Sequence, residues 1–588
     1  MSLLNKASLI QIPSGYKDGT LYSAKPTNGD GDFTFSRGSN LAATRVNSEG
    51  LIEKGRENLF FASDTSDSTA GRAIRGSSTT IKGVSGFLYS DDAGNPNINK
   101  SIAGYSTGFA TFSIYVDTTN ANTIQLNFAI DGSAINGTQA KFNATTKTWN
   151  SIVENTSYVS SGSTQLNFED LGDNVFRLSI GANFTPSGST YLPVVYFGTG
   201  NTNVAIGGGQ VEKGLVATDY IETTTTTAQA GILEDMPRLD YSGGATCPSL
   251  ILESQRSNAM ANSEYFGGYN IAQMTLEHNY AISPEGVQNA TRLIENTAGG
   301  TAHSVSIATP TTATEHGWSV YAKPNGRDYI YLYVGSGVGQ GKIFDIANGA
   351  IGSNVGSAPN DTKIEDAGNG WYRCTIFVNG IAGSPTPTIG LANSLTSFTY
   401  TGDGTSGVFI YGAMLEAGSY PTSYIPTYGS SVTRSKDVAN DLSAADLIGN
   451  DEGVIFIDVQ MPSVIESNTT FSIGGGTSTE YAQIEIRTDL TINWRYRLGG
   501  TDYINANVGS YVAGDRLKIA FAYKNNDSVL YKNGSSIATD TGSVATNSWD
   551  EVRFSNFAGT GNLNASVNQT LLFKTRLSND ELAALTTI

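Results

Sequence analysis

An internal repeat constrains this chain more than any other feature of its sequence. Four blocks recur in the same order, with offsets between 196 and 206 residues, as insertions in loops would produce. The matching blocks are 51–58 with 251–258, 112–116 with 318–322, 168–177 with 364–373, and 210–221 with 414–425. Because order and spacing are both retained, the sequence predicts two copies of one domain, at 58–222 and 258–428.

Each copy has the pattern of short β-strands. Residues 329–334 alternate tyrosine with aliphatic side chains, and residues 123–128 alternate in a similar way, so each strand has one apolar face to bury. Turn dipeptides such as Asn325-Gly326 and Asn369-Gly370 separate these runs, and glycine contributes 67 of the 588 residues. The pattern predicts an all-β chain of β-sandwiches, with a jelly-roll arrangement in each copy.

The last segment, 447–588, does not repeat the first two. Asn533-Gly534 predicts a tight β-hairpin, because both residues tolerate positive φ. Ser578 and Glu581 form an S-x-x-E capping box ahead of a short helix. We therefore expect a third β-sandwich that ends in one helix.

Three stretches lie outside these domains. Residues 1–57 are too few for a core of their own, so we expect another chain or the first sandwich to bury their apolar side. Residues 223–257 form a connector that begins with a run of threonines, and residues 429–446 form a linker.

Composition and charge exclude several classes of protein. There is no apolar run of about 18 residues that could span a membrane, and the run 7–12 is too short for the core of a signal peptide. The net charge is −18 without a cluster of Lys or Arg, so binding to nucleic acid is not expected. Cys247 and Cys374 are too few for a disulfide framework, and we expect two free thiols rather than one bridge.

Several segments resemble a recurrent set in the virion proteins of tailed bacteriophages. They lie at 14–53, 237–258 and 423–434, and the final domain adds 531–534 and 576–585. In that family, jelly rolls similar to carbohydrate-binding modules precede a concanavalin/laminin-G-like sandwich. The resemblance implies this fold for the whole chain, with the lectin-like domain at 447–588.

The resemblance also implies a location and partners. The protein would be made in the host cytoplasm and lie on the surface of the phage particle, as a homotrimer joined to other virion proteins through residues 1–57. Its sandwiches would contact host-surface glycan, and it would need no cofactor apart from a possible structural calcium ion. Whether it lies on the head or the tail stays open.

We therefore expect a non-enzymatic virion protein, a projecting fibre or adsorption component that attaches to the host surface. Two alternatives remain. The first is a head-decoration or tail-collar protein without receptor binding, and the second is a glycan depolymerase.

Catalytic patterns are scarce, and we assign no catalytic residue. Residues 402–407 match G-x-G-x-x-G, but an apolar strand follows instead of a helix, so the segment is expected to be a hairpin loop. A glycosidase needs two carboxylates about 5–10 Å apart. Glu485 and Arg487 share a strand face and are expected to pair with each other instead.

Aromatic residues are the candidates for contact with a glycan or another partner. Tyr329, Tyr331 and Tyr333 share one face of a predicted strand, and Trp494 and Tyr496 alternate in the same way. Sugars stack on aromatic rings, so either set could form a binding platform. The alternative is that these rings fill a core or a domain interface, where aromatic side chains are common.

Acidic loops are the candidates for calcium. Residues 28–32, 91–92 and 360–361 supply oxygen ligands, but none has a diagnostic spacing. Solvated turns are the simpler interpretation of all three, and the metal content stays unknown.

Overall fold

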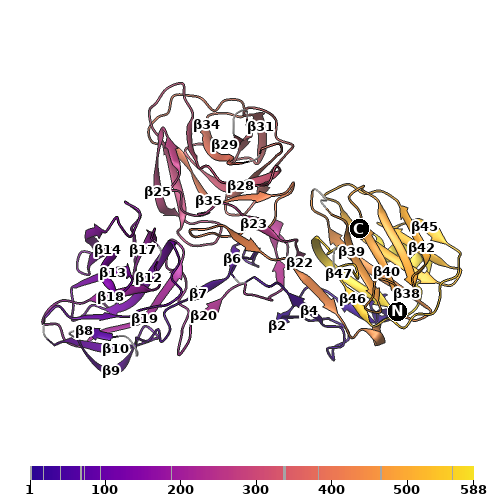
Figure 1. Ribbon diagram of the computed structural model, residues 1–588, viewed down its shortest axis with the longest axis horizontal. Helices are drawn as coiled ribbons and strands as arrows, with labels where there is room; N and C mark the ends of the chain where they lie inside the picture. Colours follow the sequence, from indigo (N-terminus) through magenta and orange to yellow (C-terminus); the bar gives the residue numbers. More distant parts are fainter. Residues whose placement is uncertain are drawn as a thin grey trace.

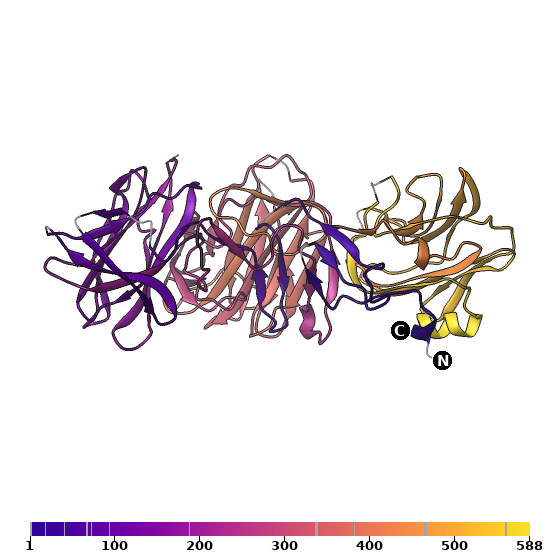
Figure 2. The ribbon, with the colours of Figure 1, turned by 90° about the horizontal axis from the view of Figure 1, so that it is seen from below.

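The computed structural model describes residues 3–17, 19–39, 41–65, 69–71, 73–92, 94–186, 188–335, 339–381, 383–463, 467–558 and 561–588. Almost all regular structure is β, which confirms the predicted fold class of successive sandwiches. Figure 1 shows three separate β-sandwiches joined by a narrow centre, and Figure 2 shows them in a row. Within the described part of the chain, no helix is long and apolar enough to cross a membrane.

The first sandwich contains two six-stranded sheets. One has the order β16 (Gln165–Asp170), β17 (Val175–Phe184), β12 (Gly108–Asp117), β19 (Val204–Lys213), β10 (Val84–Asp91), β9 (Ala73–Ile81). The other has the order β15 (Thr148–Glu154), β14 (Ser133–Asn143), β13 (Thr123–Ile130), β18 (Tyr191–Tyr196), β11 (Asn97–Asn99), β8 (Thr69–Gly71). Every pairing is antiparallel, and the apolar faces of the two sheets meet in one core.

The second sandwich is built in the same way. One sheet has the order β32 (Asp361–Asp366), β33 (Tyr372–Val378), β28 (His316–Asn325), β35 (Gly407–Ala417), β26 (Ala290–Glu295), β25 (Met274–Ala281). The other has the order β31 (Ala350–Asn354), β30 (Gln340–Asp345), β29 (Tyr329–Gly335), β34 (Thr386–Ala392), β27 (His303–Ser306), β24 (Asn270–Ala272). Each strand occupies the place of the strand numbered sixteen lower in the first sandwich, so the two units share one topology.

The likeness extends to single hydrogen bonds. Buried Asn58 donates to the carbonyls of Gly209 and Ile221, and its side-chain oxygen accepts from two backbone amides. Asn258 makes the same four bonds at the equivalent backbone positions of the second sandwich. Glu212 likewise accepts both the amide and the hydroxyl of Thr218, as Glu416 does from Thr422.

The third sandwich takes strands from both ends of the chain. One sheet has the order β21 (Arg238–Asp240), β22 (Ser249–Leu252), β47 (Ala565–Phe573), β38 (Glu452–Gln460), β43 (Arg516–Lys524), β44 (Ser528–Lys532), β45 (Ser535–Asp540), and β1 (Leu9–Gln11) also pairs with β47. The other has the order β2 (Tyr16–Lys17), β3 (Thr20–Leu21), β4 (Phe33–Ser36), β37 (Val438–Asp441), β46 (Glu551–Arg553), β39 (Thr469–Gly474), β40 (Tyr481–Ile486), β41 (Ile492–Leu498), β42 (Thr501–Val508).

The expectation for the N-terminal segment needs a correction. Leu9, Leu21, Phe33 and Phe35 are fully buried in the core of the third sandwich, and neither the first sandwich nor another chain covers them. The segment is too short for its own core, and it completes one that also takes Leu239 and Leu250 from the connector and most of its residues from the last third of the chain. Both termini therefore lie beside the third sandwich (Figure 2).

Short pairs of strands join the sandwiches. They are β5 (Thr44–Val46) with β6 (Ile52–Lys54), β7 (Arg56–Asn58) with β20 (Ala228–Ala230), and β23 (Arg256–Asn258) with β36 (Val432–Arg434). The remaining elements are α1 (Leu3–Lys6), the 3₁₀ turns η1 (Ser242–Gly244) and η2 (Ala445–Leu447), and α2 (Asn579–Thr586). The N-terminal segment thus runs from the third sandwich through the centre to the first (Figure 1).

Several local predictions are confirmed. Asn533 and Gly534 have positive φ at the turn between β44 and β45. Ser578 and Glu581 form the capping box of α2. Both cysteines are free thiols, Cys247 exposed and Cys374 buried. The domain boundaries themselves stay predictions.

Candidate functional site

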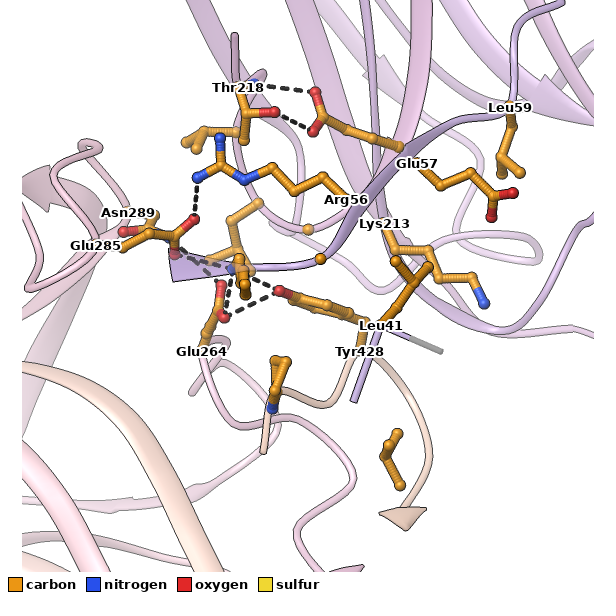
Figure 3. A pocket seen from close by; sticks show the side chains of 18 residues that line it. Leu41, Arg56, Glu57, Leu59, Lys213, Thr218, Glu264, Glu285, Asn289 and Tyr428 are labelled. Carbon is orange, nitrogen blue, oxygen red and sulfur yellow. Dashed lines mark hydrogen bonds and ion pairs between the residues drawn. The ribbon is translucent and has the colours of Figure 1, made fainter. Parts of the chain in front are cut away.

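The junction between the first two sandwiches encloses a cavity of about 200 Å³ (Figure 3). Lys54 lies buried between Glu264 and Glu285, with its Nζ 2.8 Å from an oxygen of each. Arg56 Nη2 lies 2.6 Å from the other oxygen of Glu285. Two cations therefore face two carboxylates, and removal of one would leave an uncompensated buried charge.

Hydroxyl groups complete this network. Tyr424 and Tyr428 donate to the same oxygen of Glu264, and the Tyr411 hydroxyl lies between that oxygen at 3.2 Å and an oxygen of Glu285 at 2.7 Å. Burial alone would raise the pKa of Glu285, but the attraction of Lys54 and Arg56 outweighs it and lowers that pKa to about 2. Lys54 and Arg56 of the connecting strands thus pair with Glu264 and Glu285 of the second sandwich, which ties these strands to that sandwich.

The two backbones meet directly at this junction. Gly108 opens β12 of the first sandwich with φ of 111°, and an added Cβ would lie 1.6 Å from the carbonyl oxygen of Tyr428. Gly429 packs against it with φ of 126°. Only glycine fits such a close approach in this part of φ space, so the contact holds the first sandwich tightly against the start of the linker.

A second charged cluster joins the three connecting segments. The buried guanidinium groups of Arg37, Arg238 and Arg434 come from the N-terminal segment, the connector and the linker. Arg238 binds both Asp437 and Glu253, and Arg434 Nη1 lies 2.8 Å from Glu253. Arg37 Nη1 approaches Asp437 at 3.4 Å. This cluster fixes the second sandwich relative to the third.

An open cleft of about 350 Å³ lies beside this cluster. Its floor is the outer face of a sheet of the second sandwich, where Tyr321 and Arg373 lie on neighbouring strands. The N-terminal segment around Arg45 and the connector form two walls, and an edge of the third sandwich around Ser566 forms another. Four parts of the chain thus converge on one polar cleft, which is a common position for ligand sites.

The cleft floor is a constellation of one arginine and two tyrosines. The Arg373 guanidinium lies 5.6 Å from the ring centre of Tyr321, and that ring meets Tyr424 edge to face at 6.3 Å. Arg373 donates to the Thr422 carbonyl and the Ser319 hydroxyl, while its Nε has no hydrogen-bond partner in the described structure. A buried donor of this kind calls for a physical explanation.

The first sandwich carries the same constellation. Arg177 lies 5.3 Å from the ring centre of Tyr115, which meets Tyr220 edge to face at 5.7 Å. In both copies a register shift in the central strand pair accompanies a glycine of positive φ, Gly208 or Gly412, directly beside the first tyrosine ring. Only the copy in the second sandwich lies in the cleft.

The predicted aromatic platform on β29 is largely covered. Ile330, Leu332 and Val334 fill the core, as the alternation predicts. Tyr331 on the opposite face is 5% exposed and packs on Phe398 at 5.0 Å between ring centres, because a loop of the same sandwich folds over it.

Its two neighbours, Tyr329 and Tyr333, are half-buried in the same outer cluster, and the Tyr333 hydroxyl accepts from the Gly339 amide. The expectation of a platform of three rings, all exposed or half-exposed, therefore needs correction at Tyr331 alone. A binding role for the edges of Tyr329 and Tyr333 stays a prediction.

The second aromatic candidate lies in a core. Trp494 and Tyr496 are 2% and 0% exposed, and Tyr496 packs on Trp549 at 4.8 Å. Both rings point inward from β41 to the core of the third sandwich, so their faces are not available to a ligand at the surface. Trp494 and Tyr496 therefore follow the alternative interpretation, in which the aromatic rings fill a core.

The remaining sequence candidates have local partners. Glu485 and Arg487 pair at 2.7 Å, as predicted. Asp91 accepts two loop amides and Asp32 accepts the Ser23 amide and hydroxyl, as in solvated turns. Among the described residues, no group of three His, Cys, Asp or Glu side chains is arranged to hold a metal ion.

Sequence reasoning did not single out the cleft, although the signal was present. Tyr321, Arg373 and Tyr424 all belong to the repeated blocks, where each matches an identical or similar residue of the first copy. For Arg373, recurrence favours a structural role. It could not indicate that the connector and the third sandwich would enclose only the second set.

Comparisons with known proteins give remote likenesses. No family model and no curated protein matches the chain. The CBM40 domain of the Ruminococcus gnavus IT-sialidase, bound to α2,3-sialyllactose, is 22% identical over 25% of this chain and 87% of its own, with a TM-score of 0.22. Trypanosoma rangeli sialidase in complex with a difluoro-KDN is 11% identical over 98% of this chain and 93% of its own, also with a TM-score of 0.22.

These comparisons affect one expectation. The structures that align with nearly the whole chain are sialidases, which are enzymes, and this contradicts the expectation of a non-enzymatic protein. That expectation is withdrawn. A TM-score of 0.22 carries no argument that this chain has their activity.

Proposed function

We propose that this chain is a surface component of a tailed-phage particle that recognises glycan on the host cell. The sequence resemblance supports the virion assignment, and it covers all three sandwiches. The observation that carries the glycan assignment is the cleft of about 350 Å³ beside a cluster of buried ion pairs, with the partly exposed polar side chains of Lys363 and Glu365 in its lining. Walls that are already held in place favour recognition, because the cleft loses little conformational entropy when a ligand binds.

Attachment to the particle is part of the same proposal. The apolar side of β1 to β4 is occupied by the third sandwich, so other virion proteins would contact the outer surface of residues 1–57 or of that sandwich. A homotrimer is the proposed assembly state. Mass photometry of the purified chain measures it directly.

A glycan depolymerase is the second candidate. Asp240, Glu253 and Glu365 all line the cleft, and glycosidases use pairs of carboxyl groups. Glu253 is the least suited to proton transfer. Burial would raise its pKa, but Arg434 and Arg238 outweigh that effect and keep the pKa far below its ordinary value. Asp240 and Glu365 are therefore the pair to test.

One experiment separates these functions. Fluorescently labelled protein is incubated with host cells before and after periodate oxidation of their glycans, and released reducing ends are measured in the same samples. Binding that periodate abolishes, without new reducing ends, supports recognition. New reducing ends that D240N or E365Q abolishes support the depolymerase. Binding that survives oxidation contradicts both. Labelling of particles with an antibody to the chain tests the virion assignment.

A further inference from the structure

The tyrosine and arginine in the floor of the cleft have equivalents in the first sandwich, but the surrounding walls do not. Tyr115 and Arg177 occupy the same strand positions as Tyr321 and Arg373, with the same hydroxyl partner for the arginine. Each arginine also leaves Nε without a hydrogen-bond partner among the described residues. The shared constellation alone therefore does not make a site. The added walls create a volume in which a ligand can be held.

The lining is polar without favouring either sign of charge. The cations are Arg45, Lys363 and Arg373, and the carboxylates are Asp240, Glu253 and Glu365. Within this set Lys363 pairs with Glu365 at 2.6 Å, and Arg45 pairs with the nearby Glu53 at 2.8 Å. Three cations against three carboxylates give no net attraction for an ion.

The net charge of the whole chain also disfavours an anionic ligand. At −18, the protein repels a polyanion over the range of the Debye length. A neutral ligand avoids that cost. It must still supply donors for the carboxylates and acceptors for Arg373 and Lys363. A sugar hydroxyl does both, because it carries one donor and two acceptor positions.

We propose that this cleft binds a neutral sugar unit of a host polysaccharide, with Glu365, Lys363 and Arg373 as the hydrogen-bonding groups and Tyr321 in its floor. The inference rests on the proposed glycan-binding function and assigns it a site and a ligand class. A cavity of about 350 Å³ lies at the small end of the range for ligand pockets, which suits one or two sugar rings.

The test uses the full chain and isothermal titration calorimetry. The probes are neutral hexasaccharides of glucose, galactose and N-acetylglucosamine, and the acidic probe is a hyaluronate hexasaccharide. Glu365→Ala removes a cleft carboxylate, and Ser566→Trp fills the cleft from the third sandwich. Glu169→Ala is the matched control, because Glu169 occupies the equivalent strand position in the first sandwich and is exposed.

We expect at least one neutral hexasaccharide to bind. E365A and S566W should weaken it at least tenfold, and E169A less than twofold, with unchanged melting temperatures. Neutral binding that neither cleft variant alters would overturn the site while leaving glycan recognition intact. Binding of hyaluronate alone would overturn the ligand class. Absence of binding to every probe at 10 mM would overturn the inference, and the cell assay above then decides whether the proposed function survives.

If S566W alone unfolds, E365A with its control still decides the question.

Discussion

The two repeated sandwiches share a frame and differ in their surroundings. Asn58 and Asn258 make the same four hydrogen bonds, and the strands of both sheets follow one order. The first sandwich is held at one end, through β7, β20 and the glycine contact. The second receives the N-terminal segment, the connector and the linker on one face. Both copies thus share one set of strands and hydrogen bonds. Only the second copy has the three connecting segments packed on one of its faces.

The difference appears in individual residues of the repeat. Position 264 of the second copy is a buried glutamate that accepts from Lys54 and from Tyr424 and Tyr428, whereas Asp64 of the first is half-buried. The carboxylate at this place in the fold thus contacts the connecting strand β6 in the second copy and is more exposed in the first. The following predictions test this contrast, from the largest effect to the smallest.

The first prediction compares the two carboxylates. Glu264→Ala leaves Lys54 with one partner fewer and deprives the hydroxyls of Tyr424 and Tyr428 of a shared acceptor, so it should destabilise the second sandwich by about 3–5 kcal/mol. Asp64→Ala should cost the first sandwich less than about 1 kcal/mol. Hydrogen exchange of core amides, followed by mass spectrometry, reads each sandwich separately. Equal costs would show that the junction is not an anchor.

The second prediction concerns what the copies share. Asn58→Ala and Asn258→Ala each remove an amide that satisfies two carbonyls and two amides in the interior, so each should cost about 2–3 kcal/mol. The two costs should agree within about 0.5 kcal/mol. A difference above about 1.5 kcal/mol in the same exchange experiment would mean that the surroundings, rather than the frame, set the stability at this position.

The third prediction uses pH, since all three histidines lie in the second repeat. Burial lowers the pKa of His278 to about 4, and its ring packs on Tyr265 at 4.6 Å. A depressed pKa gives stability that is complete above the unfolded pKa of about 6.5 and is lost as the pH falls toward 4. Between pH 7 and 5 the second sandwich should lose about 2 kcal/mol, and the first should change less.

The control for this pH effect is His278→Phe, which keeps a ring on Tyr265 and has no titrating group. It should remove the contribution of His278 and leave that of His316, whose pKa burial also lowers. If the first sandwich loses as much stability as the second over this range, His278 is not the cause.

Much of this fold could be predicted from the sequence because its signals are local. The repeat, the alternation in 329–334, the Asn533-Gly534 turn and the Ser578 capping box each depend on residues close together in the chain. The prediction for the N-terminal segment was wrong because its partner strand is distant in the sequence. Pairing of β1 with β47 joins residues more than 550 positions apart, and nothing local in 9–11 specifies that partner.

The candidate site was missed for a related reason. Alternation correctly assigned Tyr331 to the outer face of its strand, but it could not reveal the loop with Phe398 that covers the ring. In Trp494 and Tyr496 it identified a shared face without telling which side was the core. The cleft depends on three segments meeting around Tyr321, and such convergence is tertiary information.

The most direct measurement of the central claim is a crystal structure of the chain soaked with the neutral hexasaccharide that binds most tightly. The account predicts sugar density in the cleft, within hydrogen-bond distance of Glu365 or Arg373 and against the wall at Ser566, with none over Tyr115 and Arg177 of the first sandwich. Density on the first sandwich, or on the edges of Tyr329 and Tyr333 with an empty cleft, would contradict it.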